Sequence, residues 1–158
     1  MLVAWLVLCA TPSLVTAVPF KGSDFTLNGD AALVGVDLRL APAASNQSGS
    51  AFITTPWAID SDTSFHVFFQ FRISDGTGAE GLVFVVQNAP SGATALGPDG
   101  RSLGYAGITP SIAVEFDTFR TIAFGDPAPA GGTAGHVGID QNGSLTSLAI
   151  APATSPSP

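Results

Sequence analysis

The clearest pattern in the chain is an alternation of apolar and polar positions in short segments. Over 64–73, apolar side chains occupy every second position, which is the two-residue period of a half-buried strand. A nearly continuous apolar run covers 81–87, and the alternation returns over 111–117. Shorter strands are predicted at 36–40, 50–54, 136–139 and 146–150.

Turn-forming residues separate these segments. Clusters of Gly, Pro, Asp, Asn and Ser lie at 74–78 and 88–92, and no segment has a convincing helical period. Short strands joined by such turns are typical of an all-β domain, either a sandwich or a barrel.

The strand that ends at Asp117 carries the first candidate chemistry. Alternation predicts that Ile112, Val114 and Phe116 are buried, and it places Glu115 beside Asp117 on the opposite face. Two neighbouring carboxylates repel each other, so the pKa of one of them rises unless a cation intervenes. A divalent cation would replace this repulsion with shared coordination.

Two further residues can complete a metal site. Asp126 precedes a proline in a turn-rich loop, and His136 begins the next apolar strand. Together with the two strand carboxylates they offer hard oxygens to calcium and one imidazole to a transition metal. The spacing alone is equally compatible with a solvated sheet face and an unrelated histidine.

The two ends of the chain differ from its centre. An uncharged apolar run near Met1 predicts a secretory signal peptide over 1–17, although no Lys or Arg accompanies it. Its removal would also remove Cys9, the only cysteine. A domain over 18–150 would follow, and the Pro- and Ser-rich residues 151–158 are expected to be a tail or linker.

The charge of the chain restricts its partners. Twelve acidic residues against five basic ones give a net charge of −7, which argues against a nucleic-acid partner. A cationic ligand remains possible, and calcium is the obvious candidate. Asn46 and Asn142 lie in glycosylation sequons, which supports secretion weakly.

Several stretches resemble, in chain order, the legume-type (L-type) lectin domain. The most specific is the acidic strand from Val114 to Phe119, followed by Asp126 and then by the strand from His136 to Asp140. It is similar to the metal-binding signature of that family. The other matching stretches are 28–31, 38–40, 47–52, 69–71 and 79–87, with 95–97 and 103–108 closer to bacterial or protist members.

This resemblance covers about 20–150 and implies a fold and a function. The fold would be a concanavalin-A-like β-sandwich, or jelly roll. Because complete members extend well beyond residue 150, its C-terminal strands would be missing. The function would be carbohydrate binding at a site braced by Ca²⁺ and Mn²⁺, with glycans or glycoproteins as partners and homo-oligomers formed through sheet edges.

The resemblance also assigns roles to individual residues. The manganese-like ion would be held by Glu115, Asp117, Asp126 and His136. Calcium would be held by Asp117, Asp126, the carbonyl group of Phe119 and position 121, which is Thr121. The carbohydrate-binding residues would be Glu80, Arg101, Phe119 and Thr121.

Three of these positions depart from the family pattern. Glu80 replaces an aspartate, Thr121 replaces an asparagine, and Arg101 stands where a loop glycine is expected. These changes leave open a non-sugar-binding adhesive or structural module on the same fold. A sandwich-fold glycoside hydrolase would need a second glutamate at 119 or 120, where Phe119 and Arg120 stand, so no enzyme activity is expected.

Overall fold

The computed structural model describes residues 7–9, 18–62, 64–74, 80–126 and 135–152. These residues form short strands and 3-10 turns, and every strand pairing is antiparallel. Within them, no helix has the length and apolarity needed to cross a membrane. The prediction of an all-β chain is confirmed for the described residues.

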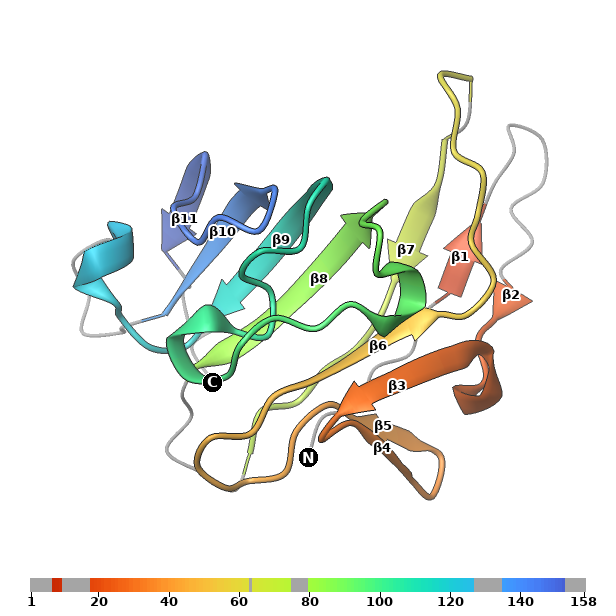
Figure 1. Cartoon of the computed structure of the whole chain (residues 1–158), viewed down its shortest axis with the longest axis horizontal. Coiled ribbons are helices and arrows are strands. Elements are labelled where there is room, and N and C mark those ends of the chain that lie inside the picture. Colours follow the sequence, from red (N-terminus) through yellow and green to blue (C-terminus); the bar gives the residue numbers. More distant parts are fainter. Residues whose placement is uncertain (1–6, 10–17, 63, 75–79, 127–134, 153–158) are drawn as a thin grey trace, which may run out of the picture.

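The strands follow the chain from β1 to β11 (Figure 1). They are β1 Val7–Cys9, β2 Val18–Pro19, β3 Phe25–Gly29, β4 Ala32–Val34, β5 Asp37–Arg39, β6 Gly49–Ile53, β7 His66–Phe68, β8 Gly81–Gln87, β9 Ser111–Asp117, β10 His136–Gln141 and β11 Ala149–Pro152. The 3-10 turns are η1 Gly22–Asp24, η2 Gly92–Thr94, η3 Gly100–Ser102 and η4 Ile122–Phe124.

Agreement with the predicted strands is best where the apolar pattern is longest. β8 and β9 cover the two predicted segments 81–87 and 111–117. The predicted strand over 64–73 is wrong in length, because only β7 pairs within it. β11 extends two residues into the predicted tail, which is possible because an exposed edge strand tolerates Pro152.

A four-stranded sheet in the order β11-β10-β9-β8 forms the centre of the molecule (Figure 1). Outside it lie the β3-β6 pair, the β4-β5 hairpin and the sheet β2-β1-β7. In this last sheet, β1 pairs with β7 although it belongs to the predicted signal peptide.

Burial of the two faces of β9 differs from the prediction. Ile112 is 54% exposed, and Val114 and Phe116 are only half-buried. Glu115 and Asp117, on the other face, are 3% and 6% exposed. The predicted burial of the apolar face was therefore wrong in this respect: the acidic face is the more deeply buried one.

The reason is that the long connection between β8 and β9 folds back over the acidic face. Tyr105, Ile108 and Ala95 of this connection are buried against Ala113 of β9 and against Leu145. Half-buried side chains extend this small core: Phe52, Val83, Val85, Leu103, Ala106 and Phe124.

Polar bonds fix the same connection to the β3-β6 pair. The side-chain amide of Asn28 donates to the carbonyl of Ala93 at 2.9 Å, and the hydroxyl of Ser50 donates to the carbonyl of Ala95 at 2.6 Å. The connection is thus tied to the β3-β6 pair, and it also packs on the face of β9 that carries Ala113.

Aromatic rings cover part of the opposite face. Phe69 stacks on Phe84 with ring centroids 5.5 Å apart, and Phe71 lies 4.9 Å from Phe116. Ile112 remains exposed at the other end of that face.

Tyr105 should be a stability determinant. Its hydroxyl donates to Ser111 Oγ at 2.9 Å and accepts from the Gly143 N–H at 3.1 Å, while Ser111 Oγ donates to the Ile108 carbonyl. Tyr105→Phe removes the bond to Ser111 and leaves the half-buried Gly143 N–H without this partner, so it should lower the free energy of unfolding by about 1–3 kcal/mol. Urea unfolding measures this loss.

Thr26→Val is the matched control, because the Thr26 hydroxyl shares its hydrogen bond with the Thr54 hydroxyl at an exposed position. It should change the free energy of unfolding by less than about 0.5 kcal/mol. Equal losses in the two variants would show that the tyrosine hydroxyl does not hold the connection in place.

Candidate metal centre

Strand register brings the predicted acidic and histidine ligands together. Asp117 of β9 pairs with His136 of β10 and with Gly81 of β8, and Glu115 pairs with Gly138. Directly paired residues share one sheet face with Cβ atoms about 4.5–5.5 Å apart. The two-residue period then adds Asp140 to the same face.

The side chains converge on a small space. Ligand atoms of Glu115, Asp117 and His136 all lie within 4.8 Å of one another. His136 Nε2 lies 4.0 Å from Glu115 Oε2, which is longer than a hydrogen bond. Such a separation fits two ligands on either side of one metal ion at about 2.0–2.2 Å each.

The segment after β9 wraps around this cluster. The backbone N–H of Phe119 donates to Asp117 Oδ1 at 2.5 Å, and that of Thr121 donates to Asp126 Oδ2. Each of these two carboxylates therefore accepts a backbone hydrogen bond with one of its oxygens.

Burial separates this cluster from the rest of the chain. Among the described residues, every buried polar or charged side chain belongs to it or to its loop. These residues are Glu115, Asp117, Thr121, Asp126, His136 and Asp140.

Several of the buried polar atoms have no hydrogen-bond partner among the described residues. They include Glu115 Oε2, both ring nitrogens of His136 and both carboxylate oxygens of Asp140. Leaving such groups unpaired costs several kcal/mol in total, because each costs about 1–3 kcal/mol. A divalent ion supplies the missing partner for oxygens and imidazole together, so the donor set fits a metal.

The carboxylates respond electrostatically to this crowding. Burial, and then the adjoining Asp140 carboxyl group, raise the pKa of Glu115 to about 9. Burial raises the pKa of Asp117 to about 6, although the Phe119 N–H and His136 act in the opposite direction. Without a cation, the protonated forms of these carboxyl groups are therefore favoured, and a bound cation would replace the protons.

Asp140 was not predicted as a site residue. The sequence suggested a strand end, but Asp140 is fully buried and lies against Glu115. Asp140 follows Gly138 by two residues and His136 by four, so the two-residue period of a strand places all three on one face. This spacing is the feature of the sequence that could have identified Asp140. That signal becomes interpretable only when β10 is known to pair with β9.

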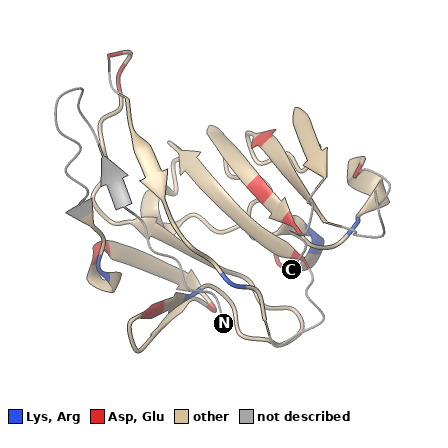
Figure 2. Cartoon of the chain, turned by 180° about the vertical axis from the view of Figure 1, so that it is seen from behind, with Lys and Arg blue, Asp and Glu red and all other residues tan. Residues whose placement is uncertain are grey.

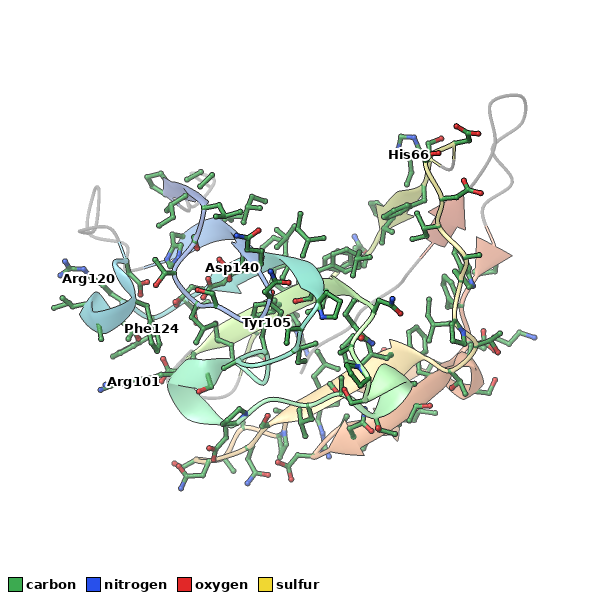
Figure 3. All side chains as sticks on the ribbon, turned by 45° about the horizontal axis from the view of Figure 1, so that its top comes forward. His66, Arg101, Tyr105, Arg120, Phe124 and Asp140 are labelled. Atoms are coloured by element: carbon green, nitrogen blue, oxygen red, sulfur yellow. The ribbon has the colours of Figure 1, made fainter. Side chains whose placement is uncertain are left out.

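Three of the predicted sugar-contacting residues, Glu80, Phe119 and Thr121, lie next to the end of β9. The carbonyl of Glu80 accepts from the Thr118 N–H at 2.9 Å and from its hydroxyl at 3.0 Å, which ties Glu80 to the end of β9. Phe119 is 46% exposed, whereas Thr121 is buried. Figure 3 shows Arg101 on the side of the molecule that also carries Phe124 and Arg120.

The two sequon asparagines are both exposed. Asn46 has a positive φ of 58° and Asn142 one of 54°. The side-chain oxygen of Asn142 accepts from the Ser111 N–H at 3.2 Å. Glycosylation at either position stays a prediction.

Acidic segments gather at the end of β9 and on β10 (Figure 2). The described residues thus combine antiparallel β-sheets with a buried acid–histidine cluster at a strand end. The chain matches the legume lectin domain over residues 18–157, and it belongs to that family. Its fold is accordingly the concanavalin-A-like β-sandwich that the sequence resemblance implied.

The raised pKa values predict how the metal-free protein responds to pH. Glu115 and Asp117 keep protons in the folded chain at pH values where the unfolded chain has lost them. The free energy of unfolding should therefore fall as pH rises from about 5 to about 9. Thermal unfolding in EDTA measures this trend. Glu115→Gln should remove most of the decrease, and a decrease of equal size in that variant would contradict the assignment.

Gly138 should be required for the packing beside Glu115. A Cβ atom at Gly138 would lie 2.3 Å from Ser147 Oγ and 3.4 Å from Glu115 Oε2. Gly138→Ala should therefore lower the free energy of unfolding by about 1–3 kcal/mol, measured in urea. Adding Ser147→Ala removes the closest atom and should recover part of the loss; no recovery would mean that another clash dominates.

Proposed function

We propose that this lectin-like carbohydrate-binding domain holds two divalent ions that brace its sugar site. The observation that supports this most directly is the convergence of all buried polar and charged side chains, among the described residues, on one strand end. Burial of uncompensated charges lowers the free energy of unfolding, so we expect a ligand that compensates the desolvated charges of this cluster.

The donor types suggest which ion each group would hold. Glu115, Asp117, Asp126 and His136 combine carboxylates with one imidazole, a set that suits manganese or another transition metal. Calcium prefers oxygen ligands and would take Asp117 and Asp126, the carbonyl of Phe119 and Thr121. The burial of Thr121 favours this ion-side role over direct contact with a sugar.

Charge supports two ions rather than one. Four carboxylates are buried together, those of Glu115, Asp117, Asp126 and Asp140. Two divalent ions carry the matching positive charge. A single ion would leave uncompensated negative charge in a desolvated site, which is costly.

The sugar would bind at the surface above these ions. The carboxylate of Glu80 would accept hydrogen bonds from sugar hydroxyls, and Arg101 would donate to them. The exposed ring of Phe119 offers an apolar surface for a sugar face. The ions keep the segment from Phe119 to Asp126 in position, so their removal would disorganise the sugar site.

Localisation and assembly are further parts of the proposal. The apolar N-terminus and the exposed sequon asparagines support export through a secretory pathway. All four residues of β11 are exposed at the edge of the central sheet, which supports oligomers formed through sheet edges. Legume lectin domains are generally non-enzymatic, and we propose no catalytic activity.

Metal analysis and glycan binding test this function together. Full-length protein purified with Ca²⁺ and Mn²⁺ should retain about two ions, bind glycans on an array and lose binding in EDTA. Asp117→Asn should lower both metal content and glycan binding at least tenfold. Asp62→Asn, at an exposed position away from the cluster, should change neither.

The possible outcomes separate the alternatives. Metal-loaded protein that binds no glycan would indicate the adhesive or structural module. Protein that retains no stoichiometric metal and melts at the same temperature in EDTA would overturn the metal-braced site.

A further inference from the structure

We propose that Asn142 is a site of spontaneous deamidation in the folded protein, and that the hydroxyl group of Tyr105 controls the rate. The reaction converts an asparagine that precedes a glycine to aspartate or isoaspartate, and it needs no enzyme. This modification site does not depend on the metal cluster or on the sugar-binding function proposed above.

Two asparagines of the chain precede a glycine, Asn28 and Asn142. In such a pair the backbone nitrogen of the glycine attacks Cγ of the asparagine, because glycine has no side chain to obstruct the approach. A bond forms between that nitrogen and Cγ, the bond from Cγ to Nδ2 breaks, and the proton lost by the attacking nitrogen leaves with ammonia. Water then opens the cyclic imide at either carbonyl group and gives aspartate or isoaspartate.

The fold restrains the first of these pairs. Asn28 is half-buried in β3, and its side-chain amide donates to Ser50 Oγ at 3.0 Å and to the Ala93 carbonyl at 2.9 Å. Both bonds engage the nitrogen that would leave as ammonia. The pairing of Gly29 with Gly49 fixes the backbone as well. Ring closure at Asn28 therefore requires contacts of the β3-β6 pair to break first.

The second pair lies in an exposed turn after β10. Asn142 and Gly143 have positive φ values of 54° and 69°, as the central residues of a type I′ turn do. The Ser144 N–H closes this turn on the Gln141 carbonyl at 3.0 Å. Asn142 is exposed, and within the described part of the chain its Nδ2 donates no hydrogen bond. Its side chain is therefore accessible to water, unlike the half-buried one of Asn28.

Hydrogen bonds restrain the reacting atoms of this turn. The Gly143 N–H donates to the Tyr105 hydroxyl at 3.1 Å, so the attacking nitrogen is engaged. The side-chain oxygen of Asn142 accepts from the Ser111 N–H at 3.2 Å and from the Thr109 hydroxyl at 3.4 Å. These bonds must break before the nitrogen can reach Cγ, so local opening of the turn should limit the rate.

Tyr105 provides the restraint that a single substitution can remove. Its side chain is 1% exposed, and its hydroxyl shares a hydrogen bond of 2.9 Å with Ser111 Oγ, which fixes the group that accepts from Gly143. Tyr105→Phe releases the attacking nitrogen. The loss of a hydrogen bond of ordinary strength should raise the population of the open turn, and with it the rate, by about fivefold.

The modification would have a structural consequence. Isoaspartate inserts an extra backbone atom before Gly143, so the Gly143 N–H can no longer reach the Tyr105 hydroxyl in the same turn. The bond from the Gly107 N–H to the Gly143 carbonyl depends on the same geometry. Both bonds hold the connection between β8 and β9, so deamidation should loosen the cover over the acidic face of β9.

Peptide mass spectrometry measures the reaction during incubation of the full-length protein at mildly alkaline pH with Ca²⁺ and Mn²⁺ present. The protein should be produced without N-glycans, because Asn142 lies in a sequon and a glycan would occupy the leaving nitrogen. In the folded protein, Asn142 should deamidate at least about tenfold faster than Asn28. In urea, where the fold restrains neither pair, the two rates should agree within about threefold.

Variants test the role of the tyrosine hydroxyl. Tyr105→Phe should raise the rate at Asn142 about fivefold and leave the rate at Asn28 unchanged. Asn28 serves as the internal control, since global unfolding would accelerate both sites. Thr26→Val removes an exposed hydroxyl that bonds to Thr54, so it should change neither rate.

The contrary outcomes are distinct. Equal rates at Asn28 and Asn142 in the folded protein, or no reaction at Asn142, would overturn the site. A slower Asn28 in urea would show that the local sequence, rather than the fold, selects Asn142. An unchanged rate at Asn142 in Tyr105→Phe, or an equal rise at both asparagines, would overturn the role of the Tyr105 hydroxyl.

Discussion

The repulsion between carboxylates buried at the end of β9 is the constraint on which the rest of the structure depends. Glu115 and Asp117 cannot both be ionised in a desolvated space without a compensating positive charge. The surrounding loop organises itself around the same groups, since backbone N–H groups of Phe119 and Thr121 donate to Asp117 and Asp126. A cation at this point would neutralise the strand end and fix the segment that forms the binding surface, so stability and recognition would share one cause.

The covering of the acidic face follows from this constraint. In many antiparallel sheets the polar face is solvated, but here the connection between β8 and β9 packs over it with Tyr105 and Ile108. Exclusion of water strengthens every electrostatic interaction beneath that cover. Among the described residues, Phe69 and Phe71 cover part of the opposite, apolar face, and Ile112 remains exposed. The buried core that includes Ala113 therefore lies on the same face of β9 as Glu115 and Asp117.

The surface above the cluster combines opposite charges with different tasks. Glu80, held through its carbonyl by Thr118, is suited to accept hydrogen bonds from hydroxyl groups. Arg101 is exposed in η3, and it lies on the side of the molecule that also carries Phe124 and Arg120. Because Arg101 is exposed and departs from the family pattern, it is the position at which this domain would acquire its own specificity.

The sequence by itself determined the strands with long apolar periodicity, β8 and β9, and the acidic and histidine side chains that lie together at the end of β9. Those features are local, because a two-residue period assigns side chains to faces without any knowledge of partners. The sequence could not decide which face is buried, and it gave the wrong answer for Ile112 because the covering connection comes from a distant segment. It also missed Asp140, whose proximity to Glu115 depends on the register between β10 and β9. Register and coverage are long-range properties, and only the tertiary structure decides them.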